Sequence, residues 1–506
     1  MSGRFKVLFI YPNTEMATLV PINLSLLAPC LREAGFEVEL FDTTYYKWEE
    51  INFEQKKVDL LQLRPFSYKE KGVDYRDTDM YEDLRKKVND FSPDLIAITL
   101  VEDTFDLGIS LLAAIRDYKA PVIAGGVFVT FSAEEVIANE DVDIVCIGEG
   151  EEALVELCEK MRRREDYSSV LNLWVKREGR IIKNPMRKLT DINALPYIDY
   201  DIFERKHLYR PMQGKIYTMI HVEIDRGCPY DCTYCEAPHL RKLFQEQGCG
   251  IYYRRKRIDR VIDEMKHLVR KYNPDYINFN AESFLARPLA ELKEFAERYR
   301  EIGLPFWCQS RPETVTEEKI KILKEMNCQN MQFGIEHGNE EFRSRMLNRH
   351  YTNKQMLEAF KIVEEYGIAY TVNNIIGFPD ETRELVFDTI AVNRHINPAT
   401  MNVYLFTPYK GTRLYQYCIE KGYLDRSDKV HQLLDGVPLK MDTISYHELK
   451  GLQRTFPLYA KMPEAMFKEI RVAERFDNEG NEMFNKLREK YYEMHFSQHR
   501  QTKEED

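Results

Sequence analysis

The sequence predicts an α/β protein with two successive sheets and a mainly helical C-terminal region. Short apolar segments alternate with helix-like segments over residues 1–165, which is the pattern of a doubly wound, Rossmann-like parallel sheet. Six more strand–helix units follow within residues 213–412 and predict a partial (β/α)6 barrel. The chain has 506 residues, more than one ordinary hydrophobic core accommodates.

The regions outside the two sheets are predicted from turn residues and composition. Residues 166–212 are expected to form a linker with one hairpin, because two strand-like runs flank Glu178-Gly179. Residues 413–506 are expected to be mainly helical, to cap the barrel and to contribute the substrate pocket. The last ten residues, 497–506, are expected to fray.

Five strands are expected in the first sheet, interrupted by a charged stretch over residues 47–78 with little apolar content. Their sequences are FKVLFIYP (5–12), FEVELFD (36–42), DLIAITL (94–100), PVIAGG (121–126) and VDIVCIG (142–148). Such sheets bind ligands beyond the carboxyl ends of their strands. The residues at those ends are Pro12, Thr99, Gly125, Gly126, Gly148, Glu149 and Gly150. Glycines there permit close approach of a ligand, although a tight turn alone would also explain them.

Six strands are expected in the barrel, and polar residues follow several of them. The strands are IYTMIHVEID (216–225), DYINFN (275–280), PFWCQS (305–310), NMQFGIE (330–336), YTVNNIIG (370–377) and MNVYLFTP (401–408). Residues near their carboxyl ends include Asn280, Glu282, Ser310, Arg311, Glu336, His337, Gly377, Thr407 and Tyr409. A barrel places its active site at this end of its strands.

Three cysteines follow the first barrel strand in the segment RGCPYDCTYCEAP, residues 226–238. Cys228, Cys232 and Cys235 can each ligate one iron of a 4Fe–4S cluster, and three protein ligands leave one iron open for a ligand with an amine and a carboxylate. Cys249 is a conceivable fourth ligand. A zinc knuckle with His239 as the fourth ligand is the alternative. Zinc knuckles often have two Cys-x-x-Cys pairs, so the cysteine spacing and the barrel context disfavour it.

Composition limits the classes of partner. The formal net charge of −11 argues against a nucleic-acid-binding surface. There is no run of about 20 apolar residues, so no membrane span is expected, and the N-terminus lacks the layout of a signal peptide. The other cysteines are scattered, which indicates a reducing environment and a cytoplasmic location.

The Cys-x-x-x-Cys-x-x-Cys spacing, with Tyr234 before the third cysteine, resembles the radical S-adenosylmethionine (SAM) superfamily. The resemblance extends over residues 215–412 and implies a 4Fe–4S cluster and SAM as cofactors, with Tyr234 beside them. It further implies that Glu282 contacts the SAM amino group, Arg311 its carboxylate, and Glu336 the ribose or methionine polar groups. A surface ion pair or a helix cap is the alternative role for Glu282 and Arg311.

The segment from Asn373 to Asp380 is similar to the Gly-x-Ile-x-Gly-x-x-Glu element that lies near the adenine in this superfamily. Gly377 matches the second glycine. The sequence departs from this element at two positions, because Asn373 stands in place of the first glycine and Asp380 in place of the glutamate.

The order of segments in residues 5–160 resembles the cobalamin-binding domain that precedes many radical SAM enzymes. The resemblance implies that the nucleotide tail or corrin edge is lined by Gly125, Gly126, Val127, Gly148, Glu149 and Gly150, with Pro12 and Thr99 at the neighbouring strand ends. No histidine precedes His207, so cobalamin is expected to bind without a histidine lower ligand. Residues 100–102 (Leu100, Val101 and Glu102) are the candidates for its lower face. A domain of this fold that has lost its ligand is the alternative.

Together the resemblances imply a class B-type, cobalamin-dependent radical SAM C-methyltransferase. One SAM would methylate cob(I)alamin, and a second would yield a 5′-deoxyadenosyl radical that removes hydrogen from an unactivated carbon, which then takes the methyl group. The expected partners are a small-molecule, peptide or protein substrate and a reducing protein such as flavodoxin or ferredoxin. Three alternatives remain: an anaerobic cyclase or oxidative enzyme with the same cofactors, a methylthiotransferase, and a non-catalytic cofactor-binding protein.

Overall fold

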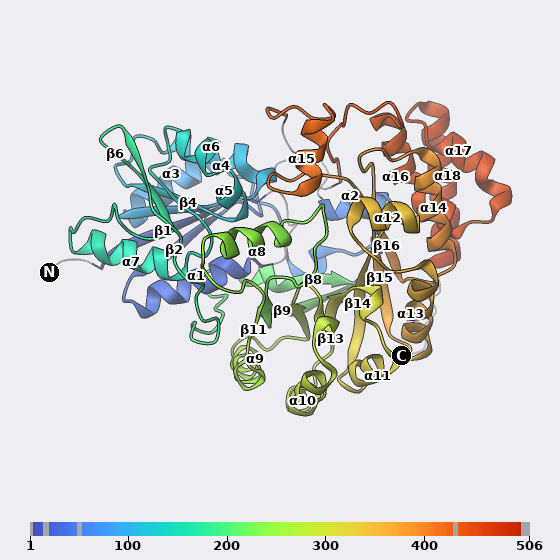
Figure 1. Cartoon of the computed structure of the whole chain (residues 1–506), viewed down its shortest axis with the longest axis horizontal. Coiled ribbons are helices and arrows are strands. Elements are labelled where there is room, and N and C mark those ends of the chain that lie inside the picture. Colours follow the sequence, from blue (N-terminus) through green and yellow to red (C-terminus); the bar gives the residue numbers. More distant parts are fainter. Residues whose placement is uncertain (1–3, 14–19, 48–52, 429–433, 497–506) are drawn as a thin grey trace.

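The computed structural model describes residues 4–13, 20–47, 53–428 and 434–496. Residues 497–506, for which fraying was expected, lie outside this part. Figure 1 shows the first sheet and its helices on one side of the molecule and the barrel on the other, with the C-terminal helices beyond the barrel. The arrangement confirms the predicted fold class.

The first sheet has seven strands in the order β2-β1-β3-β4-β5-β6-β7. They are β1 (Lys6–Tyr11), β2 (Glu37–Asp42), β3 (Leu95–Thr99), β4 (Val122–Gly125), β5 (Ile144–Cys146), β6 (Leu173–Arg177) and β7 (Arg180–Lys183). The first five are parallel. Strands β6 and β7 are the predicted hairpin, which extends this sheet because β6 pairs antiparallel with β5. The strand order reverses between β1 and β3, the usual place for a ligand in such sheets.

Helices cover both faces of this sheet. One face packs against α1 (Ile22–Glu33) and α7 (Glu151–Arg162), and the other against α3 (Met80–Phe91), α4 (Phe105–Ala114), α5 (Val127–Phe131) and α6 (Ala133–Ala138). Helix α3 was not anticipated from the sequence. Its buried residues Met80, Leu84, Val88 and Phe91 lie on one side of the helix, and the Asp79 carboxylate caps its start by accepting hydrogen bonds from Tyr81 N and Glu82 N.

The second sheet has the order β16-β15-β14-β13-β12-β9-β8. Its strands are β8 (Tyr209–Met212), β9 (Lys215–Glu223), β12 (Tyr276–Asn280), β13 (Phe306–Ser310), β14 (Cys328–Glu336), β15 (Ala369–Ile376) and β16 (Thr400–Leu405). All except β8 are parallel, so the six predicted barrel strands are present. The helices between them are α8 (Ala237–Glu246), α9 (Ile258–Tyr272), α10 (Leu289–Tyr299), α11 (Glu317–Glu325), α12 (Glu340–Leu347), α13 (Asn353–Glu365) and α14 (Arg383–Arg394). A two-stranded ribbon, β10 (Asp225–Arg226) with β11 (Arg254–Arg255), borders the barrel mouth.

Side chains alternate between the two faces of the curved sheet. Ile277 and Phe279 belong to the apolar core on the helix side, so Asn278 between them faces the lumen. By the same alternation and the strand register, the lumen-facing residues include His221, Asn278, Trp307, Gln309, Gln332, Asn373 and Asn402. The lumen is therefore lined largely by neutral polar groups.

The C-terminal region is helical, as expected, with α15 (Arg413–Glu420), α16 (Tyr446–Lys461), α17 (Phe467–Ala473) and α18 (Asn478–His495). One continuous cluster of buried apolar side chains runs from α1 and α7 through the barrel to α18. In the described part of the chain, no helix is long and apolar enough to cross a membrane.

Candidate active site

The three cysteines lie on the loop that joins β10 to α8, at the mouth of the barrel. The loop begins at Gly227, whose φ of +89° and contact with Tyr252 require glycine, because a Cβ would lie 2.9 Å from the Tyr252 ring. From α8, the Arg241 guanidinium donates hydrogen bonds to the Cys228 and Tyr230 carbonyls, each at 3.1 Å. The Thr233 hydroxyl donates to the Met346 carbonyl at 2.6 Å. These contacts within the protein hold the loop in place.

Two of the three thiols, Cys228 and Cys235, lie in a setting that disfavours free thiolates. The pKa of Cys228 is raised to about 11, mainly by burial, with smaller upward effects of Glu282 and Cys232. The pKa of Cys235 is also raised by burial, with added effects of Glu282 and the other two thiols. The Cys228 and Cys235 thiols would ionise only against a strongly cationic partner, which suits an iron–sulfur cluster. Within the described residues, no group of three His, Cys, Asp or Glu side chains is arranged to hold a metal ion, and this includes the three cysteines.

Arg311 lies directly against the cysteine loop. Its Nη1 donates to Cys232 Sγ at 3.2 Å, and its guanidinium stacks 3.8 Å from the centre of the Tyr230 ring. Its Nε also donates to the Glu313 carboxylate at 2.6 Å. The structure therefore places a buried cation beside Cys232, a predicted cluster ligand, at the end of β13.

Tyr234 and Glu336 are brought together by Arg349, a residue that the sequence analysis missed. Arg349 Nη1 donates to Tyr234 Oη and to Glu336 Oε1, each at 2.9 Å. Burial raises the pKa of the Glu336 carboxyl, and Arg349 opposes that shift. Glu336 also has a left-handed backbone, with φ +65°, at a point where the register between β14 and β15 shifts. Such conformations are uncommon outside glycine and cluster at functional sites.

Glu282 lies close to the cysteine loop and has no hydrogen-bond or ion-pair partner among the described residues. Its carboxylate is accessible from the open barrel mouth, but surrounding protein still raises its pKa by desolvation. It is near enough to raise the pKa of Cys228 and Cys235. An unpaired carboxylate here is suited to a cationic group such as an amine.

In the segment after β15, the neighbouring residue Glu381, and not Asp380, binds the backbone of the loop. The Asp380 carboxylate points away from the loop that precedes it and accepts hydrogen bonds from Tyr417 Oη at 2.5 Å and Tyr423 Oη at 2.6 Å. The neighbouring Glu381 instead binds the backbone N–H groups of Gly377 and Phe378. Glu381 therefore holds this loop.

Asn373 lies deeper in the barrel, on β15. Its Oδ1 accepts hydrogen bonds from Gln332 Nε2 and Asn402 Nδ2, each at 2.8 Å. This amide row spans three adjacent strands of the lumen.

A cavity of about 500 Å³ lies beyond the carboxyl ends of the first sheet and extends to the barrel mouth. Seven of the eight residues predicted there line it: Thr99, Gly125, Gly126, Val127, Gly148, Glu149 and Gly150. From the barrel side it is lined by Glu223, Arg226, Leu240, Phe244, Tyr252 and Asn280. Gly126 is required by close packing, because a Cβ would lie 2.3 Å from the Leu100 carbonyl oxygen. The cavity suits a ligand with a large apolar surface.

The remaining predicted residues of the first sheet lie elsewhere. Pro12 does not line the cavity and instead lies against Gly108 of α4. Of residues 100–102, only Val101 lines the cavity. Leu100 is buried in the core, and Glu102 accepts a hydrogen bond from Lys410 N at 3.2 Å. Among the described residues that line the cavity there is no histidine.

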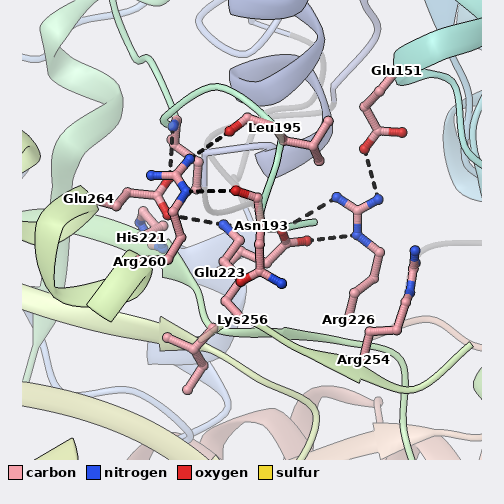
Figure 2. A network of polar contacts seen from close by, with 12 residues as sticks. Glu151, Asn193, Leu195, His221, Glu223, Arg226, Arg254, Lys256, Arg260 and Glu264 are labelled. Atoms are coloured by element: carbon pink, nitrogen blue, oxygen red, sulfur yellow. Dashed lines mark hydrogen bonds and ion pairs between the residues drawn. The ribbon is translucent and has the colours of Figure 1, made fainter. Parts of the chain in front are cut away.

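An ionic network joins the two domains at the edge of this cavity (Figure 2). Figure 2 shows Arg226, two residues before Cys228, between Glu151 of the first domain and Glu223 on β9, which it contacts at 2.8 Å and 3.0 Å. Arg226 also contacts Glu149 of the first domain at 3.0 Å. Arg254 also pairs with Glu149. Glu149 thus both lines the cavity and holds the domains together.

A second part of the network lies behind the first. Lys256 pairs with Glu223 at 3.4 Å and with Glu264 at 3.0 Å. Glu264 also accepts a hydrogen bond from Ile198 N at 2.8 Å, which ties the linker to α9. These charges are buried but mutually compensated.

Cys249 and His239 were considered as additional metal ligands in the sequence. In the structure each makes a different contact. The Cys249 thiol donates to the Gln247 carbonyl at 3.7 Å. His239 lies near the Phe131 ring and lines a second hollow of about 1050 Å³ between the hairpin, α8 and α15.

Two protein-family models match different parts of the chain. A model of the radical SAM superfamily matches residues 222–391, and a model of the B12 binding domain matches residues 66–158. The chain is 26% identical to an uncharacterized methyltransferase, PH0819, of Pyrococcus horikoshii, over 77% of this chain and 83% of the relative. It is 22% identical to the anaerobic magnesium-protoporphyrin IX monomethyl ester cyclase of Rubrivivax gelatinosus, over 68% of this chain and 62% of the relative.

The fold is similar to that of a solved radical SAM methyltransferase, TsrM from Kitasatospora setae, with cobalamin and a 4Fe–4S cluster bound. The TM-score is 0.63 at 20% sequence identity, over 83% of this chain and 75% of that one.

Proposed function

We propose that this protein is a cobalamin-dependent radical SAM C-methyltransferase. The proposal starts from its two matched domains, a B12-binding domain followed by a radical SAM domain. The reaction moves a methyl group from SAM, by way of cobalamin, to an unactivated carbon of a small molecule or of a peptide or protein residue. When bound, the cluster and SAM would supply a hydrogen-abstracting radical, and cobalamin would supply the methyl group. Electrons would come from a protein such as flavodoxin or ferredoxin.

One observation carries the proposal: the cavity of the first sheet ends at residues that adjoin the cysteine loop. Arg226 and Asn280 line the cavity from the barrel side, and Arg226 is two residues before Cys228. A ligand in the cavity would therefore face a substrate held in the barrel mouth. Methyl transfer from one cofactor to a carbon activated by the other needs this proximity.

The side chains at the mouth fit the expected roles. Cys228, Cys232 and Cys235 would hold the cluster, and the unpaired Glu282 carboxylate would bind an amino group. Arg311 and the pair of Glu336 with Arg349 would supply the remaining charges toward a SAM-like ligand.

The cavity lining also supports a cobalamin held without a histidine ligand. Val101, which is 47% exposed, is the residue of the loop after β3 that lines it. An aliphatic side chain cannot donate to cobalt. We expect the electron paramagnetic resonance spectrum of the cobalt(II) form to lack nitrogen splitting from a protein ligand.

Substitution of one cluster cysteine tests the assignment. Cys232→Ala should remove the iron–sulfur absorbance and the reductive cleavage of SAM to 5′-deoxyadenosine. Cys308→Ala is a matched control, since Cys308 is buried on β13 on the helix side of the sheet. Cleavage that persists in Cys232→Ala would exclude the proposed cluster site.

Ring closure with the same cofactors is the second candidate, favoured by the similarity to the magnesium-protoporphyrin cyclase. The mass of the product separates the two reactions. A gain of one methylene unit supports methylation, whereas loss of hydrogen or gain of oxygen supports the cyclase.

A further inference from the structure

The barrel is an open arc, and its two edges differ in what covers them. Strand β16 forms one edge and the β8–β9 hairpin forms the other. An uncovered edge strand leaves backbone N–H and C=O groups unpaired and leaves the lumen open at the side. One segment of the first domain contacts both edges. It lies within the charged stretch of residues 47–78, for which the sequence indicated no role.

Gln62 binds the free edge of β16. Its Nε2 donates to the Val403 carbonyl at 3.2 Å, and its Oε1 accepts from Val403 N at 3.0 Å. Gln62 is fully buried. The side-chain amide thus replaces the backbone of a neighbouring strand.

The same segment reaches the opposite edge three residues later. A Cβ on Gly214, in the β8–β9 turn, would lie 3.3 Å from the Pro65 carbonyl oxygen and 3.8 Å from Arg64 Cβ. Leu61 is buried in the main core. Residues 61–65 therefore cross the gap between β16 and the β8–β9 turn.

Helix α2 (Phe53–Asp59), which begins this segment, packs beside the lumen. Lys57 Nζ donates to Tyr404 Oη at 3.4 Å, and the Val58 carbonyl accepts from Tyr492 Oη of α18 at 3.1 Å. In Figure 1, α2 lies with the barrel and the C-terminal helices, far from the strands β1 and β2 of similar colour.

We propose that residues 53–66 are a barrel-closing segment that completes the lumen wall and excludes solvent, with Gln62 as the positioning residue that holds it. A radical reaction needs a lumen shielded from water and oxygen. The closure itself does not depend on the proposed reaction, so it can be tested without cofactors.

Trp307 provides the reporter. It lies on β13 between Phe306 and Cys308, which face the helix-side core, so its ring faces the lumen. In a background of Trp48→Phe and Trp174→Phe, Trp307 is the single tryptophan, and acrylamide quenching measures its exposure. Gln62→Met should at least double the quenching constant and make the Val403 amide exchange its hydrogen about fivefold faster, the factor expected for one lost hydrogen bond.

Gln453→Met is the matched control. Gln453 Nε2 donates to the same Val403 carbonyl at 3.1 Å, but from α16 in the helical layer. This variant should lose stability without raising the quenching of Trp307. Unchanged quenching in Gln62→Met, or an equal rise in both variants, would overturn the proposal.

A second pair of variants covers the case in which Gln62→Met does not fold. Lys57→Ala removes the contact with Tyr404 and should raise quenching by a smaller amount. Lys69→Ala, exposed on the adjoining 3-10 helix Tyr68–Lys71, should leave it unchanged. Equal quenching in the two variants would count against the segment as a wall.

Discussion

Asp103 is a buried carboxyl group that makes stability depend on pH. It follows β3, and its Oδ1 is buried with no hydrogen-bond partner among the described residues. Burial, followed by the charge of Glu102, raises its pKa from 3.8 to about 7. Glu236, in the cysteine loop, and Tyr409, in the loop after β16, lie near Asp103. Burial raises the pKa of both groups, and the charge of Asp103 adds to the shift.

The sign of the effect follows from proton binding. Between about pH 4 and pH 7 the folded protein keeps a proton on Asp103 that the unfolded chain has lost, so stability falls as pH rises through this window. The shift from 3.8 to about 7 corresponds to at most about 4 kcal/mol, and partial solvent screening reduces the expectation to about 2 kcal/mol.

Asp103→Asn should therefore stabilise the protein at pH 8 and leave it nearly unchanged at pH 4. Thermal unfolding midpoints measured from pH 4 to pH 8.5 check this. A difference from the parent protein that is the same at every pH would contradict the assignment of the titrating group.

Single residues also show where prediction from sequence ends. Glu282 and Arg311 could be predicted because they follow strands whose ends meet at one edge. Arg349 could not, because it follows a helix and meets Tyr234 across 115 positions in the chain. Motif spacing pointed to Asp380, whereas the loop is held by Glu381, and only the backbone geometry distinguishes the two.

Among the elements, the two-residue strand β10 carries Arg226, which connects the two domains by ion pairs. Its Arg226 is surrounded by Glu149, Glu151 and Glu223 and precedes the cysteine loop. Removing one partner of a buried ion pair leaves the others uncompensated at a cost of about 3–5 kcal/mol. Arg254 and Lys256 still pair with Glu149 and Glu223, so we expect a cost near the lower value.

Arg226→Met should accordingly destabilise the protein by about 3 kcal/mol and weaken the binding of hydroxocobalamin. Urea unfolding and absorbance titration measure the two effects. Adding Glu151→Gln should restore part of the loss, because it removes a carboxylate that Arg226 no longer neutralises. Arg257→Met, which changes an exposed pair with Asp259, is the control, and an equal cost there would refute the network's role.

Elements were predictable where their hydrophobic period was clear. In the barrel strands, residues that face the helix-side core alternate with residues that face the lumen. All six strands were predicted from their sequences. Helix α3 was missed because its four buried residues are separated by charged ones within a hydrophilic stretch. The placement of residues 53–66 could not be predicted, because it rests on the contact between Gln62 and Val403, 341 positions apart.

At the scale of the whole molecule, the two sheets are connected by a shared apolar core and by polar contacts as well as by the linker. The main apolar core is continuous from α1 through the barrel to α18. Arg226 and Gln62 add polar contacts between the domains, and Arg32 of α1 pairs with Asp199 at 2.8 Å. The cavity lies between the sheets, so its shape depends on their relative position, which no local sequence pattern specifies.

These contacts predict that the domains unfold together. Chains of this size often unfold domain by domain, but a shared core makes separation of the sheets expose apolar surface on both. Calorimetry of the protein without cofactors should show one peak, and near-ultraviolet and far-ultraviolet circular dichroism should give coincident transitions. Gln62→Met should shift that single transition without splitting it, because the apolar core remains shared. Two resolved transitions in the parent protein would mean that the domains are thermodynamically independent, and that the cavity between them is not held by the fold alone.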